Sequence, residues 1–398
     1  MFLNTTLARR VVATVAAAGL ATGAGAQQYS IVDMGTLGGP VSAGFAVNDL
    51  GHAAGAATLV GAAYHGLYWN GSAGAGVAPL AGDSQCWAFG VDGADRVVAM
   101  SYTLGAATTH GVMWQNGVGT ALGGLAPRGI SSSGLVAGFI TVSDAEVGAA
   151  DHAAVWTQGV VTDLGTLGGK TSYAAGVNAA GQVAGWSFAA GNLNVRAALW
   201  QGGAALDLGT LGGARSQAYA ISNAGGVAGW GLTAAGEAHA MLLQVDAAGV
   251  VTQRRDLGVL AGGYSYAYGV NNALDVVGTS GSRAFLWRAG SMVDLNTRVA
   301  PGSGWVLERA WAISDSGVIV GTGLHQGFAR GFVLVPACYA NCDNSSTPPI
   351  LNVNDFVCFQ QKFAAGDPYA NCDGSTIQPV LNVNDFVCFL SRFAGGCE

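Results

Sequence analysis

The clearest chemical pattern in the chain lies at its C-terminal end, where oxygen-bearing and sulfur-bearing side chains recur thirty residues apart. Residues 340–367 align without a gap with residues 370–397, and both copies contain the nonapeptide LNVNDFVCF. Each copy has an oxygen-rich stretch followed by an apolar run with helical spacing. Dense oxygen donors are typical ligands of hard cations, and clustered cysteines are candidates for disulfides.

This duplicated loop–helix layout resembles the dockerin family, especially the cysteine-containing dockerin-like tails of exported bacterial proteins. The resemblance implies two EF-hand-like Ca²⁺ sites and docking to a cohesin-like or cell-surface protein. The ligands implied by matching the family's loop are Asn341, Asp343, Ser345, Asn352 and Asp355 in the first copy, and Asn371, Asp373, Ser375, Asn382 and Asp385 in the second.

Two departures from that loop weaken the expected affinity. Each copy has extra residues around Pro349 or Pro379, and each has only two carboxylates. We therefore expect calcium binding in the roughly 0.1–1 mM range of extracellular modules. The alternative is that Asn354 and Asp355 simply cap a helix.

Six of the seven cysteines lie after residue 337, which indicates a small module held together by disulfides in an oxidising compartment. The internal duplication favours the pairs Cys342–Cys358 and Cys372–Cys388, leaving Cys338 to pair with Cys397. The seventh, Cys86, has no evident partner in the sequence. We interpret it as a buried apolar residue in preference to a reactive thiol.

The rest of the chain consists of tandem repeats that would position any larger site. In each unit, the third predicted strand ends with a tryptophan or a leucine. These terminal residues recur about every 44 residues, which gives seven units. They fall at Trp69, Trp114, Trp156, Trp200, Leu243, Trp287 and Leu334. A period of this length is typical of propeller blades.

Each unit predicts four short antiparallel strands. In the fourth unit, SYAAGVN and QVAGWS form a hairpin, RAALW is a third strand and VTDLGTL is a fourth. The chain opens with a fourth-type strand (31–37), and the repeats end with a third-type strand (329–335). We therefore predict an all-β, seven-bladed β-propeller of four-stranded blades, closed by the N-terminal strand.

Residues 29–336 resemble the HAF family of extracellular repeats, through segments such as HAAVW and RAFLW and the repeated DLGTLGG. The resemblance implies an extracellular repeat domain and carries no catalytic residues. The first position of the signature is basic in every unit: His65, His110, His152, Arg196, His239, Arg283 and Arg330. These side chains could bind an anion or a metal, but we favour a repeated structural role.

The consensus aspartates are also interpreted as repeated caps or cross-strand acceptors: Asp33, Asp163, Asp207, Asp256 and Asp294. Residues that break the repeat are better site candidates than the consensus residues, although we favour exposed loop charges and blade-packing tryptophans as their explanation. They are Asp83 and Trp87; Asp144, Glu146 and Asp151; and Trp305, Glu308, Arg309 and Trp311. Trp305 with Glu308 comes nearest to a glycan site.

The N-terminal 26 residues are expected to be a secretory signal, with Arg9 and Arg10 before an apolar run and Ala24–Ala26 as a cleavage site. No other segment predicts a transmembrane helix. A formal net charge of -7 without basic clusters argues against nucleic-acid binding. The predicted organisation is a signal peptide (1–26), a propeller (27–336) and a dockerin-like module (337–398).

These features together predict a secreted or surface-attached, non-catalytic propeller. Its tail would attach it to a partner, while the propeller would present a face to a glycan or protein ligand. Two alternatives stay open: a glycan-active enzyme, such as a glycosidase or lyase, and a lectin. The motifs searched for, including G-x-S-x-G and H-E-x-x-H, are not in the sequence.

Overall fold

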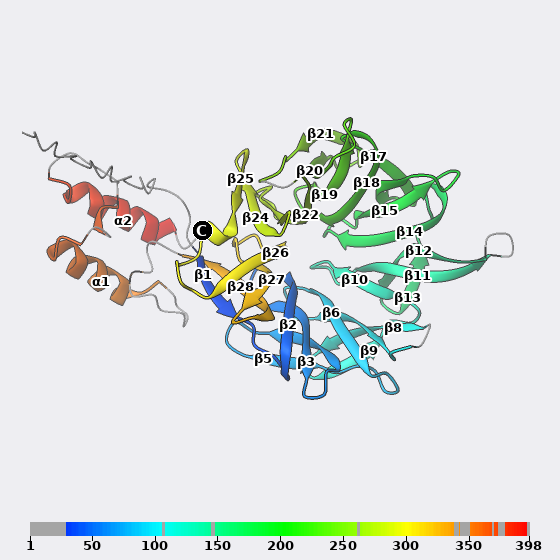
Figure 1. Ribbon diagram of the computed structural model, residues 1–398, viewed down its shortest axis with the longest axis horizontal. Coiled ribbons are helices and arrows are strands. Elements are labelled where there is room, and N and C mark those ends of the chain that lie inside the picture. The colour runs from blue at the N-terminus through cyan, green and yellow to red at the C-terminus, as the bar shows by residue number, and fades with distance from the viewer. Residues whose placement is uncertain are drawn as a thin grey trace, which may run out of the picture.

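Seven four-stranded antiparallel sheets form a seven-bladed β-propeller, as the repeat pattern predicts. The structure is a computed structural model that describes residues 29–105, 108–144, 148–260, 263–337, 342, 351–367, 370–372 and 379–395. The sheets are arranged around a centre, and the first strand of each blade contacts the first strand of the next blade (Figure 1). These seven first strands are therefore the innermost strands of the ring.

The strand boundaries follow the repeat unit closely. Blades 1 to 3 comprise β2 (Gly38–Val47), β3 (Ala53–Leu59), β4 (Tyr64–Trp69) and β5 (Gly74–Val77); β6 (Gln85–Val91), β7 (Val97–Tyr102), β8 (Thr109–Gln115) and β9 (Val118–Ala121); and β10 (Ala126–Ile130), β11 (Val136–Asp144), β12 (Gly148–Thr157) and β13 (Val160–Asp163).

Blades 4 to 6 comprise β14 (Gly168–Val177), β15 (Val183–Ala189), β16 (Val195–Gln201) and β17 (Ala204–Gly209); β18 (Gly212–Ile221), β19 (Gly226–Thr233), β20 (Ala238–Val245) and β21 (Val251–Asp256); and β22 (Ser265–Val270), β23 (Val276–Ser280), β24 (Arg283–Arg288) and β25 (Ser291–Asp294). Blade 7 comprises β26 (Trp305–Ile313), β27 (Ile319–His325), β28 (Phe328–Pro336) and β1 (Tyr29–Asp33), and the 3-10 helix η1 (Leu295–Thr297) precedes it.

The fourth strand of a blade is shorter than the sequence suggests. The segment VTDLGTL (161–167), between blades 3 and 4, is expected from the sequence to be one strand. In the structure, β13 ends at Asp163 and β14 begins at Gly168. The Gly165 N–H donates to Asp163 Oδ1 at 2.7 Å, and this hydrogen bond turns the chain away from the sheet. The Gly-Gly pair therefore opens the next inner strand, and the outer strand of blade 3 is the one that ends at Asp163.

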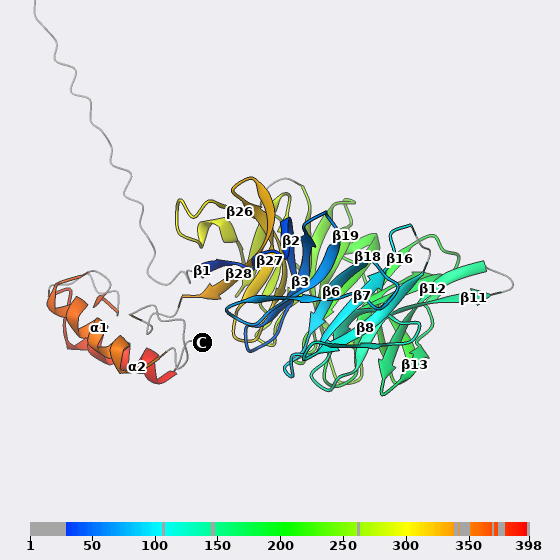
Figure 2. The ribbon, with the colours of Figure 1, turned by 90° about the horizontal axis from the view of Figure 1, so that it is seen from below.

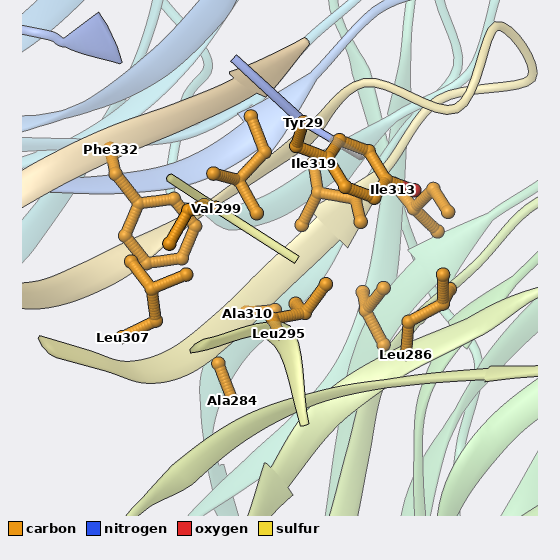
Figure 3. Packing of buried hydrophobic residues seen from close by; sticks show 12 residues of the cluster. Tyr29, Ala284, Leu286, Leu295, Val299, Leu307, Ala310, Ile313, Ile319 and Phe332 are labelled. Atoms are coloured by element: carbon orange, nitrogen blue, oxygen red, sulfur yellow. The ribbon is translucent and has the colours of Figure 1, made fainter. Parts of the chain in front are cut away.

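The N-terminal strand closes the ring in the predicted way. β1 pairs antiparallel with β28, from Tyr29 opposite Pro336 to Asp33 opposite Phe332. The Tyr29 side chain is buried in a cluster that spans blades 6 and 7 and includes Phe332 and Leu307 (Figure 3). The first and last strands of the repeat region thus complete one sheet, in which β1 covers the edge of β28 and is itself the outer strand.

Buried serines join neighbouring blades. Ser172, at the start of the blade 4 hairpin, accepts the Ala153 N–H of blade 3 at 2.8 Å and donates to the Gly165 carbonyl at 2.7 Å. Ser216 and Ser265 repeat this arrangement. These hydroxyls satisfy backbone groups that the blade interface would otherwise bury unpaired.

Cys86 occupies the same position in blade 2. It is fully buried, and burial raises the pKa of its thiol to about 11, while the Gly66 N–H hydrogen-bonds to it. The sulfur therefore takes the place of the bridging serine oxygen. This supports the structural interpretation of Cys86.

The C-terminal region contains two helices, α1 (Val353–Ala364) and α2 (Val383–Gly395), which lie side by side (Figure 2). Phe359 and Phe389 are fully buried between them and stack with ring centroids 4.1 Å apart. Disulfides link Cys342 to Cys358 and Cys372 to Cys388, the two pairs that the duplication favours. Such disulfides are typical of proteins outside the reducing cytoplasm.

Several predictions fall on parts of the chain outside the described residues. These are the signal segment (1–26), Cys338, Cys397, and the early calcium ligands Asn341, Asp343, Ser345, Asp373 and Ser375. Within the described ranges, neither helix has the length and apolar character needed to cross a bilayer.

Candidate functional site

A β-bulge occurs at the same position of every innermost strand. In blade 1, the pairing between β2 and β3 shifts between Gly44 and Ala46, so Phe45 is the extra residue. The same shift recurs in the other six blades. We call the seven extra residues the bulge ring: Phe45, Phe89, Arg128, Ala175, Tyr219, Tyr268 and Trp311. Bulges of this kind redirect a side chain and often lie beside functional sites.

Close packing of the inner strands explains why the residue after each bulge is small. A Cβ on Gly269 would lie 2.9 Å from the Cα of Ala312 in the next blade, and one on Gly176 would lie 3.2 Å from the Cα of Ala220. Only Gly or Ala follows the bulge residue in any blade. The scaffold at this level therefore tolerates little change, while the bulge residue itself varies.

Six of the seven bulge residues are large and contact one another from blade to blade. All seven are partly exposed. Ring centroids join Tyr219 to Tyr268 at 5.5 Å, Tyr268 to Trp311 at 4.4 Å, Trp311 to Phe45 at 6.0 Å and Phe45 to Phe89 at 5.5 Å, and the Arg128 guanidinium lies 4.4 Å from the Phe89 centroid. The chain of contacts is interrupted in blade 4, where the bulge residue is Ala175.

The residues two before each bulge lie beside the bulge ring, and we call the two sets together the aromatic wall. This second set is Ala43, Trp87, Ala126, Tyr173, Gln217, Tyr266 and Arg309. Trp87 stacks on Phe45 at 5.7 Å, and Gln217 accepts hydrogen bonds from Tyr219 Oη at 2.7 Å and Trp230 Nε1 at 3.1 Å. Trp87 Nε1 is buried and makes no hydrogen bond with any residue that the structure describes. The interior of the wall thus contains a buried donor that no described residue satisfies.

Partial burial affects two ionisable groups of the bulge ring. Burial raises the pKa of Tyr268 to about 12, and burial lowers the pKa of the Arg128 guanidinium, because both charged forms lose contact with water. Polar contacts to a ligand would therefore be stronger here than at an exposed surface.

The sequence identified only part of this site. Trp87 and Trp311 were selected as residues that break the repeat, and both contact Phe45 in the structure. Phe45, Arg128, Tyr219 and Tyr268 were missed, because a bulge leaves no mark in apolar alternation. The usable signal was positional: in segments such as SYAAG (172–176) and SYAYG (265–269), the fourth residue varies between aromatic, basic and small types from blade to blade, whereas the residue after it is always Gly or Ala.

One end of the ring forms a shallow bowl at the hairpin turns between first and second strands. It has a volume of about 220 Å³ and is lined by all seven blades. Its aliphatic lining repeats with little variation: Val47, Val91, Ile130, Val177, Ile221, Val270 and Ile313. Hydrogen bonds between blades surround it, including Asn48 Nδ2 to the Asp92 carbonyl at 2.8 Å and the Asp315 N–H to Asp49 Oδ1 at 2.8 Å. The hydrogen bonds around the bowl therefore join neighbouring blades.

The basic signature residues have the repeated structural role that the sequence favours. In four blades, the side chain pairs with the consensus aspartate of the same blade: His152–Asp163 (2.9 Å), Arg196–Asp207 (3.1 Å), His239–Asp256 (2.9 Å) and Arg283–Asp294 (2.9 Å). Each of these aspartates also accepts a backbone N–H two residues further on. The basic groups are held in separate blades instead of converging on one ion.

Blades 2 and 7 keep the pairing but change the residues. His110 pairs with Asp83 at 2.9 Å, and Asp83 lies before β6 instead of at the end of the outer strand. Asp33 pairs with His325 at 3.2 Å, where the repeat places Arg330. Trp305 stacks on the same His325 ring at 4.4 Å, so one face of this tryptophan is covered.

The remaining candidates do not form an acid–base pair with a common pocket. Asp151 accepts hydrogen bonds from Tyr173 Oη and from Thr141 Oγ1. The backbone carbonyl of Glu308 accepts from Thr279 Oγ1 at 2.9 Å, and Arg309 is exposed two residues before the bulge. The Asp144 side chain and Glu146 lie outside the description.

In the tail, the late calcium donors cap the helices. Asn352 Oδ1 accepts the Asn354 N–H, and the Asn352 N–H donates to Asp355 Oδ2, both at 2.8 Å. Asn382 and Asp385 repeat this arrangement in α2. Asp355 and Asp385 are fully buried, as calcium-ligating carboxylates can be, but the described part of the chain contains no group of three His, Cys, Asp or Glu placed to hold a metal. Asn371 lies among the described residues, whereas the other early donors of its copy, Asp373 and Ser375, do not.

Comparisons with known proteins agree with the fold only in outline. No family model and no curated protein sequence matches the chain. Among solved structures, similarity is found to TolB from Acinetobacter baumannii (13% identity, 69% of this chain and 60% of that chain, TM-score 0.39). It is also found to YCF48 bound to D1 peptide (9%, 77% and 94%, 0.44) and to a gluconolactonase from Xanthomonas campestris (12%, 61% and 83%, 0.36). The chain thus spans less than two thirds of the TolB chain, and these similarities assign it no ligand or activity.

Proposed function

We propose that this protein is a non-catalytic binding propeller whose ligand site is the aromatic wall at the centre of the ring. One observation carries the proposal: seven equivalent bulges present seven side chains that are not equivalent. A feature that only supported the ring would repeat with little variation, as the aliphatic lining of the bowl does. The bulge ring instead combines aromatic faces, one arginine and one gap at Ala175.

The lining groups suit binding better than acid–base catalysis. The bulge ring and the residues two before each bulge include no Asp, Glu or His. Acid–base catalysis requires a proton donor and acceptor beside the substrate, with separated pKa values. Large aromatic surfaces and a few fixed polar groups are typical of ligand pockets.

The gap at Ala175 gives a direct test of the site. We expect Ala175→Trp to fill the space and to abolish ligand binding with little change in the melting temperature. The matched control is Ala190→Trp, which adds the same side chain to an exposed position of the same blade. Equal binding by both variants would place the ligand elsewhere.

We also propose that the tail attaches the protein to a cohesin-like or cell-surface partner. The two disulfides fix each loop to its helix, and α1 and α2 expose apolar residues at matching positions: Val353 and Val383 are each 71% exposed. Exposed apolar residues repeated on two helices suit protein contact. With the expected signal segment, this supports a secreted or surface-attached location.

Calcium in the tail can be separated from simple helix capping. The full chain should gain thermal stability at millimolar Ca²⁺, and Asp355→Asn together with Asp385→Asn should remove that gain. Glu237→Gln, on the propeller, is the control because its side chain is 62% exposed. If the two tail substitutions lower the melting temperature equally with and without Ca²⁺, the aspartates act only as caps.

A glycan-active enzyme and a lectin are the alternative functions. A glycan array followed by turnover assays on each bound glycan distinguishes them. Binding without product supports the binding propeller and identifies it as a lectin, whereas release of product would overturn the non-catalytic assignment.

A further inference from the structure

Arg128 is the one cation in the bulge ring, and its environment is unusual for an arginine. The guanidinium carbon lies 4.4 Å from the Phe89 centroid and 5.6 Å from the Phe139 centroid. It makes no hydrogen bond or ion pair with any residue in the described ranges, although a guanidinium has five N–H donors. The aromatic faces hold the group in place while its donors stay available.

Two other arginines, Arg288 and Arg96, differ from Arg128 in having carboxylate partners. Arg288 donates to both oxygens of the buried Asp275, at 2.9 and 2.7 Å. Arg96 contacts Asp92 through Nε at 2.7 Å. Arg128, by contrast, has aromatic neighbours and no carboxylate partner among the described residues. Burial without a counter-ion costs free energy, and an anion bound at this point would offset that cost.

The charge of the wall is the reverse of the charge of the chain. The protein has 23 Asp and Glu against 16 Lys and Arg. Yet the bulge ring and the residues two before it contain Arg128 and Arg309 and no acidic residue. Asp151, the carboxylate nearest to this region in the hydrogen-bond network, is occupied by Tyr173 and Thr141. An anionic group entering the wall would meet the donors of Arg128, while the Asp151 carboxylate touches the wall through its hydrogen bond with Tyr173 Oη.

We propose that Arg128 binds the carboxylate of a uronate-bearing saccharide whose sugar ring packs on the aromatic wall. A carboxylate matches the guanidinium fork and accepts two parallel N–H bonds. The apolar C–H face of a pyranose suits the partly exposed aromatic surfaces of Phe45 and Trp87. This inference rests on the proposed function and names its ligand class.

Calorimetry with the full chain tests the inference, using trigalacturonate and its methyl ester as probes. The two share the same sugar backbone and differ at the carboxyl groups, which in the ester are uncharged and carry a methyl group. We expect the acid to bind roughly 10- to 100-fold more tightly than the ester, the range set by hydrogen bonds to a charged group. Arg128→Gln should remove this preference, and Arg128→Lys should retain part of it because the charge stays but the fork is lost.

Arg255→Gln is the matched control, since Arg255 also lies over an aromatic ring, that of Trp287 at 5.8 Å, but on the outer strand β21. It should bind as the unmodified protein does. Equal affinity for acid and ester, an unchanged preference in Arg128→Gln, or no binding of trigalacturonate would each overturn the uronate inference.

Failure of the proposed function would look different. If Ala175→Trp leaves the binding of every glycan array ligand unchanged, the wall is not the site at all. If that variant abolishes binding while Arg128→Gln does not weaken it, the wall is the site but its ligand is not recognised through a carboxylate.

Discussion

At the residue scale, two arginine side chains, Arg288 and Arg128, have different roles. Arg288 completes a buried ion pair with Asp275, whereas Arg128 has aromatic neighbours and no carboxylate among the described residues. The first arrangement stabilises the fold, and the second leaves donors available to a ligand.

This contrast predicts different costs for the same substitution. Arg288→Met should lower the free energy of unfolding by about 2 kcal/mol, because it leaves the Asp275 carboxylate buried without its cation, a loss reduced by the partial exposure of Arg288. Arg128→Met should change it by less than about 1 kcal/mol, since the lost cation–π contacts are offset by removal of a desolvated charge. Urea denaturation of both variants measures the difference, and equal losses would contradict the distinction.

Cys86 gives a pH-dependent prediction. Its thiol pKa is raised by burial to about 11, so the folded protein should resist iodoacetamide at pH 8 and react only after denaturation. Since the folded-state pKa exceeds the unfolded value of about 8.5, this thiol contributes stability below that pH and loses it as pH rises toward 11.

The bridging position of Cys86 supplies the control. Cys86→Ser should fold with nearly unchanged stability, because Ser172 and Ser216 occupy the same place in other blades. Cys86→Leu should destabilise the protein. Rapid alkylation of the native thiol at pH 8 would show instead that this cysteine is accessible and reactive.

Sequence reasoning at this scale succeeded where a role repeats. The histidines, arginines and aspartates of the signature were expected to have structural roles, and four same-blade pairs have that role. Arg128 was missed because its importance depends on what surrounds it, and neither Phe139 nor the absence of a carboxylate partner can be read from spacing along the chain.

At the element scale, the β-bulge is the device that turns a regular strand into part of a site. Without it, the residue at Phe45 would continue the alternation of β2. The small residue that follows allows the inner strands to approach one another, so the bulge and the close packing depend on each other.

Gly269→Ala tests that dependence. The added Cβ would lie 2.9 Å from the Ala312 Cα, and the backbone must shift, so we expect a loss of roughly 1–3 kcal/mol in the free energy of unfolding. Gly93→Ala is the control, because its Cβ would meet nothing within 4 Å. Similar melting temperatures for the two variants would mean that the inner strands are less tightly packed than the structure indicates.

The repeat predicted the strands well and their ends less well. The third strand ends at or near its aromatic or leucine mark in each blade, as in β4 at Trp69. The sequence prediction placed the end of the outer strand wrongly within DLGTLGG. The aspartate ends this strand by accepting the backbone N–H two residues further on, and a pattern of apolar alternation does not reveal such a hydrogen bond.

At the scale of the whole molecule, closure of the ring depends on five residues. β1 covers the edge of β28, and its Tyr29 is only 4% exposed. The closure was predictable from the sequence. One outer-type strand precedes the first complete blade, and the last blade has only three strands of its own, so the N-terminal strand can complete it. The placement of the site at the centre was not predictable, since it requires all seven blades to be assembled.

Removal of β1 should therefore affect far more than the N-terminus. A chain without residues 29–33 would expose the β28 edge and open the cluster around Phe332, so we expect a markedly lower melting temperature and self-association on size-exclusion chromatography. Adding the segment back as a synthetic peptide should restore part of the stability. A monomeric truncated protein with an unchanged melting temperature would show that the other blades hold the ring shut.

The pairing of β1 with β28 also has a consequence in time. Tyr29 lies opposite Pro336, so the earliest strand to be synthesised must wait for one of the latest before it finds its partner. Contacts this distant in sequence form slowly, and an unpaired apolar strand is open to misassociation while it waits. For this protein, the vulnerable period should end only when the seventh blade has emerged, which makes the last hairpin of the ring the step that commits the whole molecule to its native form.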